Sequence, residues 1–212
     1  MRILYAHGLE SGPEGYKATQ MREQGLEVTA PSMDMSLWDV RAENALLRKL
    51  LSPASLFTRW PSTWLTSAMD DSFSACVGVM QEATATGSYD VLVGSSWGGA
   101  VAAGLLATGA WNGPAVLLCP ALNLKESWGG ASPHPTLSAT AVTAALAALP
   151  AEHKARILLV HGMADETVPV EDSRALSAAT GIKLEEIRYQ RHGLGGITRD
   201  GRLVEYVRRV AA

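Results

Sequence analysis

The residues from Tyr89 to Leu106, YDVLVGSSWGGAVAAGLL, decide the fold of this chain. They open with the apolar run Val91-Leu92-Val93, and its β-branched and aliphatic side chains are typical of a buried strand. The run Gly94–Gly99 follows, and the small residues of Ala100–Leu106 are typical of a helix. The stretch therefore predicts a strand, a sharp turn and a helix in immediate succession.

A serine between two glycines occupies this turn, in the pattern Gly94-Ser95-Ser96-Trp97-Gly98. Such a strand–turn–helix is a nucleophile elbow. The turn strains the Ser96 backbone, and a Cβ at position 94 or 98 would collide with the neighbouring strand or helix. The bare pattern is weakly specific, because a Gly-rich turn in any α/β protein can produce it. Ser95 lacks the flanking glycines at the correct offsets.

Composition is that of an ordinary globular domain. The 212 residues are 47 % hydrophobic and 18 % charged, with a net charge of −3, and this length suits one α/β domain. No basic cluster exceeds Arg208-Arg209, so we expect no nucleic-acid partner. The two cysteines, Cys76 and Cys119, are expected to be reduced core residues.

Neither a signal-peptide pattern nor a long apolar run occurs in the sequence. The start of the chain has strand character rather than a charged segment followed by an apolar one. No window approaches 18 uninterrupted apolar residues, so no membrane span is expected. We therefore expect a cytoplasmic protein, and nothing in the sequence indicates its oligomeric state.

Strand-like and helix-like segments alternate along the whole chain. The expected strands are Arg2–Ala6, Leu26–Ala30, Val91–Val93, Ala115–Cys119, Ile157–Val160 and Lys183–Tyr189. The expected helices are Tyr16–Gln24, Val40–Leu51, Trp64–Ala85, Ala100–Leu106, Ala139–Leu149, Val170–Ala179 and Arg202–Val210. This alternation predicts an α/β fold, a three-layer α/β/α sandwich with about six mostly parallel strands, in a single domain over residues 1–212.

Chemically useful residues follow four of the expected strands. They are His7-Gly8-Leu9, Ser96-Trp97, Asp165 and His192. Ligands bind at the carboxyl ends of the strands in such a sheet, so we expect these loops to meet. The order serine, acid, histidine is that of the α/β-hydrolase arrangement.

With these residues in this order, the whole chain resembles the α/β-hydrolase superfamily. Its small bacterial branch of YqiA-type esterases and related thioesterases is the most similar part of that superfamily. The matching stretches are Tyr5–Gly12, Gly94–Gly99, His161–Asp165 with Val168-Pro169, and Arg191-His192-Gly193. The resemblance implies a minimal α/β-hydrolase fold and a serine hydrolase of the carboxylesterase type. It also implies that no metal or other cofactor is needed.

The resemblance assigns roles that the chemistry also supports. Ser96 would attack an acyl carbon, and His192 would serve as its base and then as the acid for the leaving group. Asp165 would fix the imidazole tautomer and stabilise the imidazolium. Backbone N–H groups of Leu9 and Trp97 would form the oxyanion hole.

Several of these residues have structural alternatives. His192 could be an ordinary loop histidine, and Asp165 could cap the helix that begins near Pro169. Glu166 and Asp172 are rival acids close by. His7 either shapes its loop or contacts substrate, and we expect His161 to support the site from behind or to be purely structural.

One segment departs from the smallest members of the family, and a second lies where many members insert a lid. Residues 35–62 form an insertion that carries Trp38, Phe57 and Trp60, and residues 122–150 include a small lid region with Trp128. The insertion is either a flap that supplies an apolar acyl wall or an extra helix that covers a sheet edge. His7, Trp38, Trp60 and Trp128 are the candidate substrate-binding residues.

Three functions fit the sequence. The first is hydrolysis of carboxylic esters with short to medium acyl chains by a Ser-His-Asp triad and an acyl-enzyme intermediate. The second applies this chemistry to a thioester such as an acyl-cysteine or acyl-coenzyme A. Binding of coenzyme A favours basic residues around the site, and Arg59 and Arg191 are the only ones that hint at this. The third is a non-catalytic ligand receptor on the same fold. The expected partner is thus a small ester, thioester or ligand.

Overall fold

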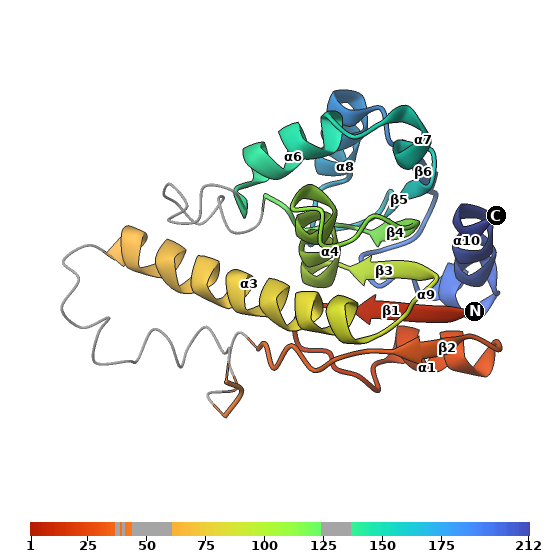
Figure 1. Ribbon diagram of the computed structural model, residues 1–212, viewed down its shortest axis with the longest axis horizontal. Coiled ribbons are helices and arrows are strands. Elements are labelled where there is room, and N and C mark those ends of the chain that lie inside the picture. The colour runs from red at the N-terminus through yellow and green to blue at the C-terminus, as the bar shows by residue number, and fades with distance from the viewer. Residues whose placement is uncertain (37–38, 40, 44–60, 124–136) are drawn as a thin grey trace.

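A parallel β-sheet runs through the middle of the molecule (Figure 1). The computed structural model describes residues 1–36, 39, 41–43, 61–123 and 137–212, and it describes residues 61–68 by their backbone alone. Within these ranges the sheet has six strands, all parallel, in the order β2 (Glu27–Thr29), β1 (Arg2–Ala6), β3 (Val91–Ser95), β4 (Ala115–Leu118), β5 (Ile157–Gly162) and β6 (Lys183–Ile187). The predicted fold class is confirmed.

Helices connect the strands, as the alternating pattern predicts. In the described ranges they are α1 (Tyr16–Glu23), α3 (Pro61–Thr86), α4 (Trp97–Ala107), α6 (Ala139–Ala147), α7 (Ala151–Lys154), α8 (Val170–Thr180), α9 (Gly195–Arg199) and α10 (Arg202–Ala211). The expected helix over 40–51 lies outside the described residues. Both chain ends lie at the side of the sheet away from the carboxyl ends of the strands (Figure 1), which leaves that edge to the connecting loops.

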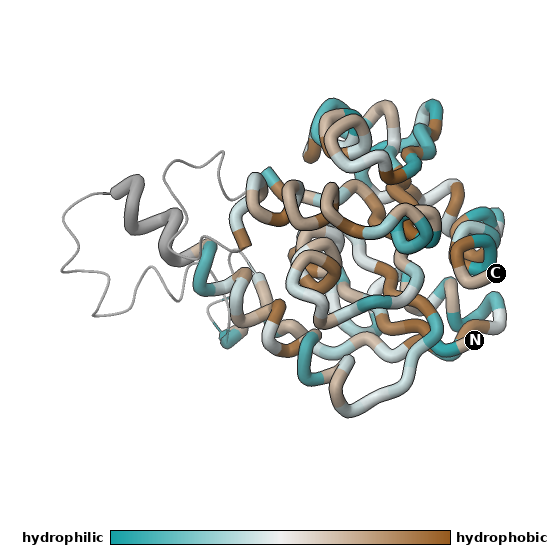
Figure 2. The backbone as a smooth tube through the Cα atoms, turned by 45° about the horizontal axis from the view of Figure 1, so that its top comes forward, coloured by the Kyte–Doolittle hydropathy of each residue, from teal (hydrophilic) through white to brown (hydrophobic). Residues whose placement is uncertain are grey.

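Successive side chains of each strand point alternately into two separate hydrophobic cores. On β1, Leu4 faces a core shared with α3, α4, α6 and α8, whereas Ile3 and Tyr5 face a core shared with α1, α9 and α10. The side chains of successive strand residues point to opposite faces, and both faces of this sheet are covered. The hydrophobic residues accordingly gather along the strands in the interior (Figure 2).

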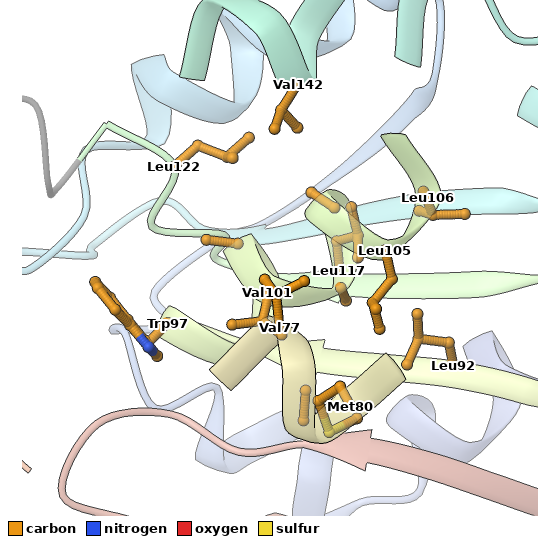
Figure 3. Close-up of a cluster of buried hydrophobic side chains, with 14 of the residues drawn as sticks. Val77, Met80, Leu92, Trp97, Val101, Leu105, Leu106, Leu117, Leu122 and Val142 are labelled. Atoms are coloured by element: carbon orange, nitrogen blue, oxygen red, sulfur yellow. The ribbon is translucent and has the colours of Figure 1, made fainter. Parts of the chain in front are cut away.

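Helix α4 lies deep in the first core. Ten of its eleven residues are buried, and its small side chains let the helix approach the sheet closely. Val101 and Leu105 lie between Val77 and Met80 of α3 and Leu117 of β4 (Figure 3). This close packing fixes the start of α4, and with it the turn that carries Ser96.

The longest described helix is α3, with 26 residues. It begins at Pro61, a residue well suited to the first turn of a helix, and the amide of Gly87 caps its end by donating to the Ala83 carbonyl. Even this helix does not combine the length and hydropathy needed to cross a membrane, and nor does any other in the described part of the chain.

Most of the expected insertion at 35–62, and residues 124–136 of the expected lid region, lie outside the described ranges.

Candidate active site

Ser96 occupies a strained turn between β3 and α4. Its φ and ψ angles are 58° and −117°, a combination that residues other than glycine rarely adopt. Two glycines make the turn sterically possible. A Cβ on Gly94 would lie 2.3 Å from the carbonyl oxygen of Gly98, and a Cβ on Gly98 would lie 2.1 Å from the carbonyl oxygen of Ala6. This is the geometry of a nucleophile elbow.

A continuous hydrogen-bonded chain joins Ser96, His192 and Asp165. The Oγ atom of Ser96 lies 2.8 Å from Nε2 of His192, and Nδ1 of His192 lies 2.7 Å from Oδ2 of Asp165. The three residues meet because each follows the carboxyl end of a strand, at the same edge of the sheet. Asp165, rather than its exposed neighbour Glu166, supplies the carboxylate.

The carboxylate of Asp165 is buried but well satisfied. Its side chain is fully shielded from solvent, and its Oδ1 accepts hydrogen bonds from the backbone N–H groups of Thr167 and Val168 at 2.8 and 2.9 Å. Burial by itself would raise the pKa of the carboxyl. The bonds from Val168, His192 and Thr167 outweigh burial and hold the pKa below its ordinary value.

This ionisation state fixes the proton positions along the chain. An ionised Asp165 can only accept, so Nδ1 of His192 must carry a hydrogen. Neutral His192 then has its lone pair on Nε2, facing Ser96, and the Ser96 hydroxyl donates to it. A histidine oriented in this way can remove the proton of a serine as it attacks.

Ser95 is placed quite differently from Ser96. It belongs to β3, where it pairs with Leu118 of β4 and is buried. Its hydroxyl interacts with Tyr5, and burial raises the pKa of that phenol above its ordinary range. Ser95 therefore lies inside the sheet, as expected for the serine without flanking glycines.

The loop after β1 and the first residue of α4 flank Ser96. A Cβ on Gly8 would lie 3.3 Å from both Cβ of Ser96 and the carbonyl oxygen of Ser95, so the loop that carries Leu9 passes beside the serine. Trp97 is the first residue of α4, and the backbone N–H groups of a first helical turn lack partners within the helix. The two backbone segments expected to supply the oxyanion hole thus border the Ser96 hydroxyl.

The side chain of Trp97 belongs to the core rather than to the solvent. It is 1 % exposed, and its ring meets Phe73 of α3 edge to face, with the ring centroids 5.4 Å apart. In the described part of the chain, its indole Nε1 is a buried donor without an acceptor. The packing on Phe73 helps to hold α4, and therefore the elbow, against α3.

The ring of His7 is buried and has a partner at each nitrogen. Its Nδ1 lies 3.0 Å from the carbonyl oxygen of Gly8, and its Nε2 accepts a hydrogen bond from the backbone N–H of Met33 at 3.2 Å. Burial lowers the pKa of His7, although the Gly8 carbonyl acts in the opposite direction. These contacts favour the loop-shaping interpretation of His7 over contact with substrate.

One group among the described residues has the composition of a metal site. Donor atoms of Cys119, His161 and Asp165 all lie within 4.8 Å of one another. Burial raises the pKa of the Cys119 thiol to about 12, so the sulfur is protonated. His161 already uses Nδ1 with Ser173 and Nε2 with the Val168 carbonyl. No lone pair of the ring is therefore free for a metal in this arrangement.

The remaining candidates, Trp38, Trp60 and Trp128, lie outside the described residues.

A groove of about 470 Å³ lies between α6 and α8, and no local sequence pattern indicates it. It begins at the segment after β4, where Ala121 donates its N–H to the carbonyl oxygen of Ser96 at 3.1 Å. Its lining comprises Pro120, Leu122, Asn123, Ala139, Thr140, Thr143, Ala144, Ala147, Asp172, Ala175, Leu176 and Ala179. These residues come together only in the folded chain.

Comparison with protein-family models and with curated proteins gives no match. Solved structures do match over nearly the whole chain. A protein assigned to the alpha/beta hydrolase superfamily from Xanthomonas campestris pv. campestris is 23 % identical, with a TM-score of 0.57 and coverage of 99 % of this chain and 95 % of that one. TT1662 from Thermus thermophilus is 18 % identical, with a TM-score of 0.67 and coverage of 99 % and 88 %.

A meta-cleavage product hydrolase from Pseudomonas fluorescens IP01 is a third similar structure. It is 18 % identical, with a TM-score of 0.57 and coverage of 99 % of this chain and 91 % of that one. At these identities the likeness concerns the fold. The chain therefore has the fold of the α/β hydrolases, with the Ser96 elbow in the middle of its sheet.

Proposed function

We propose that the protein is a serine hydrolase that cleaves carboxylic esters of short to medium acyl chains through an acyl-enzyme intermediate. The observation that carries the proposal is the hydrogen-bonded chain from Ser96 through His192 to Asp165, mounted on a strained elbow. Strain at a non-glycine residue is commonly associated with a functional site. The shared fold with proteins described as hydrolases adds support.

In the first half of the reaction, Ser96 is acylated. Its Oγ attacks the ester carbonyl carbon while its proton passes to Nε2 of His192. Asp165 stabilises the resulting imidazolium through Nδ1. When the tetrahedral intermediate collapses, the bond to the alkoxy oxygen breaks, and His192 gives its proton to that oxygen. The alcohol leaves, and the acyl group remains on Ser96.

In the second half, water regenerates the enzyme. His192 takes a proton from water as the water oxygen attacks the acyl carbon, and it returns that proton to Oγ of Ser96 as the ester bond to the serine breaks. The carboxylic acid then departs. In both halves the backbone N–H groups of Leu9 and Trp97 would hold the oxyanion, and losing one such donor typically costs about 3 kcal/mol of barrier stabilisation.

Turnover of p-nitrophenyl esters from acetate to palmitate tests the proposal. Ser96→Ala should keep its fold, because the side chain is small, and should lose about 10⁴–10⁶ in kcat. Ser95→Ala is the matched control, since Ser95 lies inside β3, and it should retain activity. Turnover by Ser96→Ala equal to that of the wild type would contradict the proposal.

The nature of the leaving group needs its own comparison. The same acyl-enzyme chemistry can act on thioesters, so matched oxygen esters and thioesters with one acyl group should be compared. A higher kcat/KM for the oxygen ester supports the proposal, and a large preference for the thioester would move the activity to that class. A folded wild-type protein that turns over neither would support the receptor hypothesis.

A further inference from the structure

A second imidazole lies against the carboxylate of Asp165. The Nε2 atom of His161 is 3.2 Å from Oδ2 of Asp165, and neither side chain has any exposed surface. His192 contacts the same oxygen from Nδ1 at 2.7 Å. Oδ2 of the acid therefore lies between two histidines, only one of which contacts Ser96.

The partners of His161 fix its tautomer. Its Nε2 is 3.0 Å from the carbonyl oxygen of Val168, and a carbonyl can only accept, so Nε2 must carry a hydrogen. Its Nδ1 is 2.7 Å from Oγ of Ser173, and in the neutral ring Nδ1 accepts from that hydroxyl. The N–H at Nε2 thus donates to the Val168 carbonyl, and Oδ2 of Asp165 lies 3.2 Å from the same nitrogen.

His161 connects three parts of the structure. The residue lies on β5, Ser173 lies on α8, and Val168 and Asp165 lie in the loop between them. The loop that presents the acid is therefore tied to both flanking elements through one buried ring. Three N–H groups, from Thr167, Val168 and His192, donate to the carboxylate, and Nε2 of His161 lies against it as a fourth nitrogen.

We propose that His161 is a positioning residue for Asp165, whose Nε2–H holds the carboxylate toward His192 and moderates the negative charge that His192 senses. The inference rests on the proposed role of Asp165 and goes beyond it, since the polar contacts of His161 are with Ser173, Val168 and Asp165 and not with Ser96. Two consequences follow. Loss of this donor leaves the carboxylate freer to rotate, which lowers kcat. Loss also concentrates negative charge on Oδ2, which favours the protonated form of His192.

Other charged or titratable groups face this cluster and stay constant in the test. Lys17 of α1 and Cys119 at the end of β4 interact electrostatically with Asp165. Glu186 of β6 lies opposite His161 in the strand pairing and is held by Arg174 at 2.6 Å. Lys17 and Cys119 are the same in every variant, whereas Glu186 also senses His161, so Ser173→Ala, which keeps the imidazole, separates the Asp165 contact from the effect on Glu186.

Four variants separate positioning from simple scaffolding. His161→Leu removes the donor at similar volume, and His161→Gln restores an N–H near the former Nε2 position. Ser173→Ala removes the partner that supports the ring and is the milder change to the fold. His153→Leu is the matched control, because α7 leads into the amino end of β5, away from the site. Active enzyme is counted by fluorophosphonate titration, so that kcat refers to folded protein.

The measured quantities are kcat, KM and the pH dependence of kcat/KM on a p-nitrophenyl ester. In His161→Leu we expect kcat to fall about tenfold, the order of one polar contact with a buried charged group, with KM nearly unchanged. The midpoint of the rising limb of the pH profile should move up by about half to one pH unit. His161→Gln should recover most of both effects, Ser173→Ala should lie between, and His153→Leu should match the wild type.

A pH profile of His161→Leu that superimposes on that of the wild type, with per-site kcat unchanged, would overturn the proposal. Imidazole ¹H–¹⁵N spectra provide a test that does not depend on turnover. They should show His161 as the Nε2–H tautomer, and the titration midpoint of His192 should rise in His161→Leu. An Nδ1–H tautomer, or an unmoved midpoint, overturns the positioning role. An inactive wild type with the expected spectra would instead contradict the hydrolase function alone.

Discussion

Among single residues, Asp165 carries the densest set of polar contacts at the site. Its side chain is wholly buried, and both of its oxygens accept hydrogen bonds. A buried carboxylate is costly unless it is paired in this way. The same contacts that stabilise the charge also set the direction in which the carboxylate meets His192.

Replacing Asp165 by Asn should therefore preserve the shape of the site and lose its function. The amide can donate to Nδ1 of His192, which favours the wrong tautomer, and kcat should fall by about 10⁴. Glu166→Gln is the matched control, because Glu166 is exposed, and it should retain activity. The measurement is kcat/KM on a short p-nitrophenyl ester, and more than a tenth of wild-type activity in Asp165→Asn would contradict the role of the acid.

Because His7 is buried, we expect the protein to lose stability in mild acid. Its pKa is lowered by burial, so below about pH 6.5, the ordinary value for histidine, the unfolded chain takes up a proton before the folded protein does. The free energy of unfolding should then fall with falling pH until the pKa in the folded state is reached. His7→Gln removes this contribution and should show a shallower decline. Urea denaturation at several pH values decides the matter, and a constant difference between the two proteins would refute the prediction.

Ser96, Asp165 and His192 were candidate site residues from the sequence because each leaves a local signal. Ser96 has its glycines, and Asp165 and His192 each follow a recognisable strand in the order typical of α/β hydrolases. The contacts of His161 with Ser173 and with Asp165 leave no such signal. They depend on how α8 returns along β5, which the spacing of residues alone does not determine.

At the scale of elements, the close approach of α4 to β1 is the feature on which the elbow depends. Gly98→Ala would place a Cβ 2.1 Å from the carbonyl oxygen of Ala6, so α4 would have to move. We expect a loss of about 1–3 kcal/mol in the free energy of unfolding, with reduced turnover.

The same substitution elsewhere should have the opposite effect. Gly78 is exposed in the middle of α3, and a Cβ there would meet no atom within 4 Å. Gly78→Ala should therefore stabilise the protein by about 0.5–1 kcal/mol. Chemical denaturation of both variants provides the comparison, and equal changes in stability would contradict the account of the elbow.

The tryptophans of the insertion give a prediction that comes from the sequence alone. If Trp60 forms an acyl wall, Trp60→Ala should leave acetate esters nearly unaffected and should shift chain-length preference, at about 0.8 kcal/mol or less per methylene. If Trp60 only packs a core, stability should fall by about 3–5 kcal/mol and all esters should suffer alike. Thermal melts beside the ester series decide, and an unchanged preference with a lower Tm refutes the flap.

At the level of elements, buried apolar runs gave the clearest signal. The strands β1, β3, β4 and β5 are almost entirely buried and each contains a run of three or four large or β-branched apolar residues or alanines, and such runs give a strong signal. The short helices α7 and α9 were not predicted, because four or five residues are too few to show a helical period. The end of α3 was recognisable from Gly87.

For the whole molecule, alternation of strands and helices predicts a parallel sheet with both faces covered. The order β2-β1-β3-β4-β5-β6 does not follow from alternation, because it depends on the direction in which each crossover returns to the sheet. That order places β3 beside β1 and β4. Ser96 therefore lies in the middle of the carboxyl edge, within reach of loops from both sides.

The most direct test of Ser96 as the nucleophile is labelling of the folded protein with a fluorophosphonate, followed by peptide mass spectrometry. The phosphonyl group should be found on Ser96 and should be absent from Ser95. Ser96→Ala should take up no label while showing the same thermal transition as the wild type. An unlabelled wild-type protein, or an adduct on a serine other than Ser96, would contradict the assignment of Ser96 as the nucleophile.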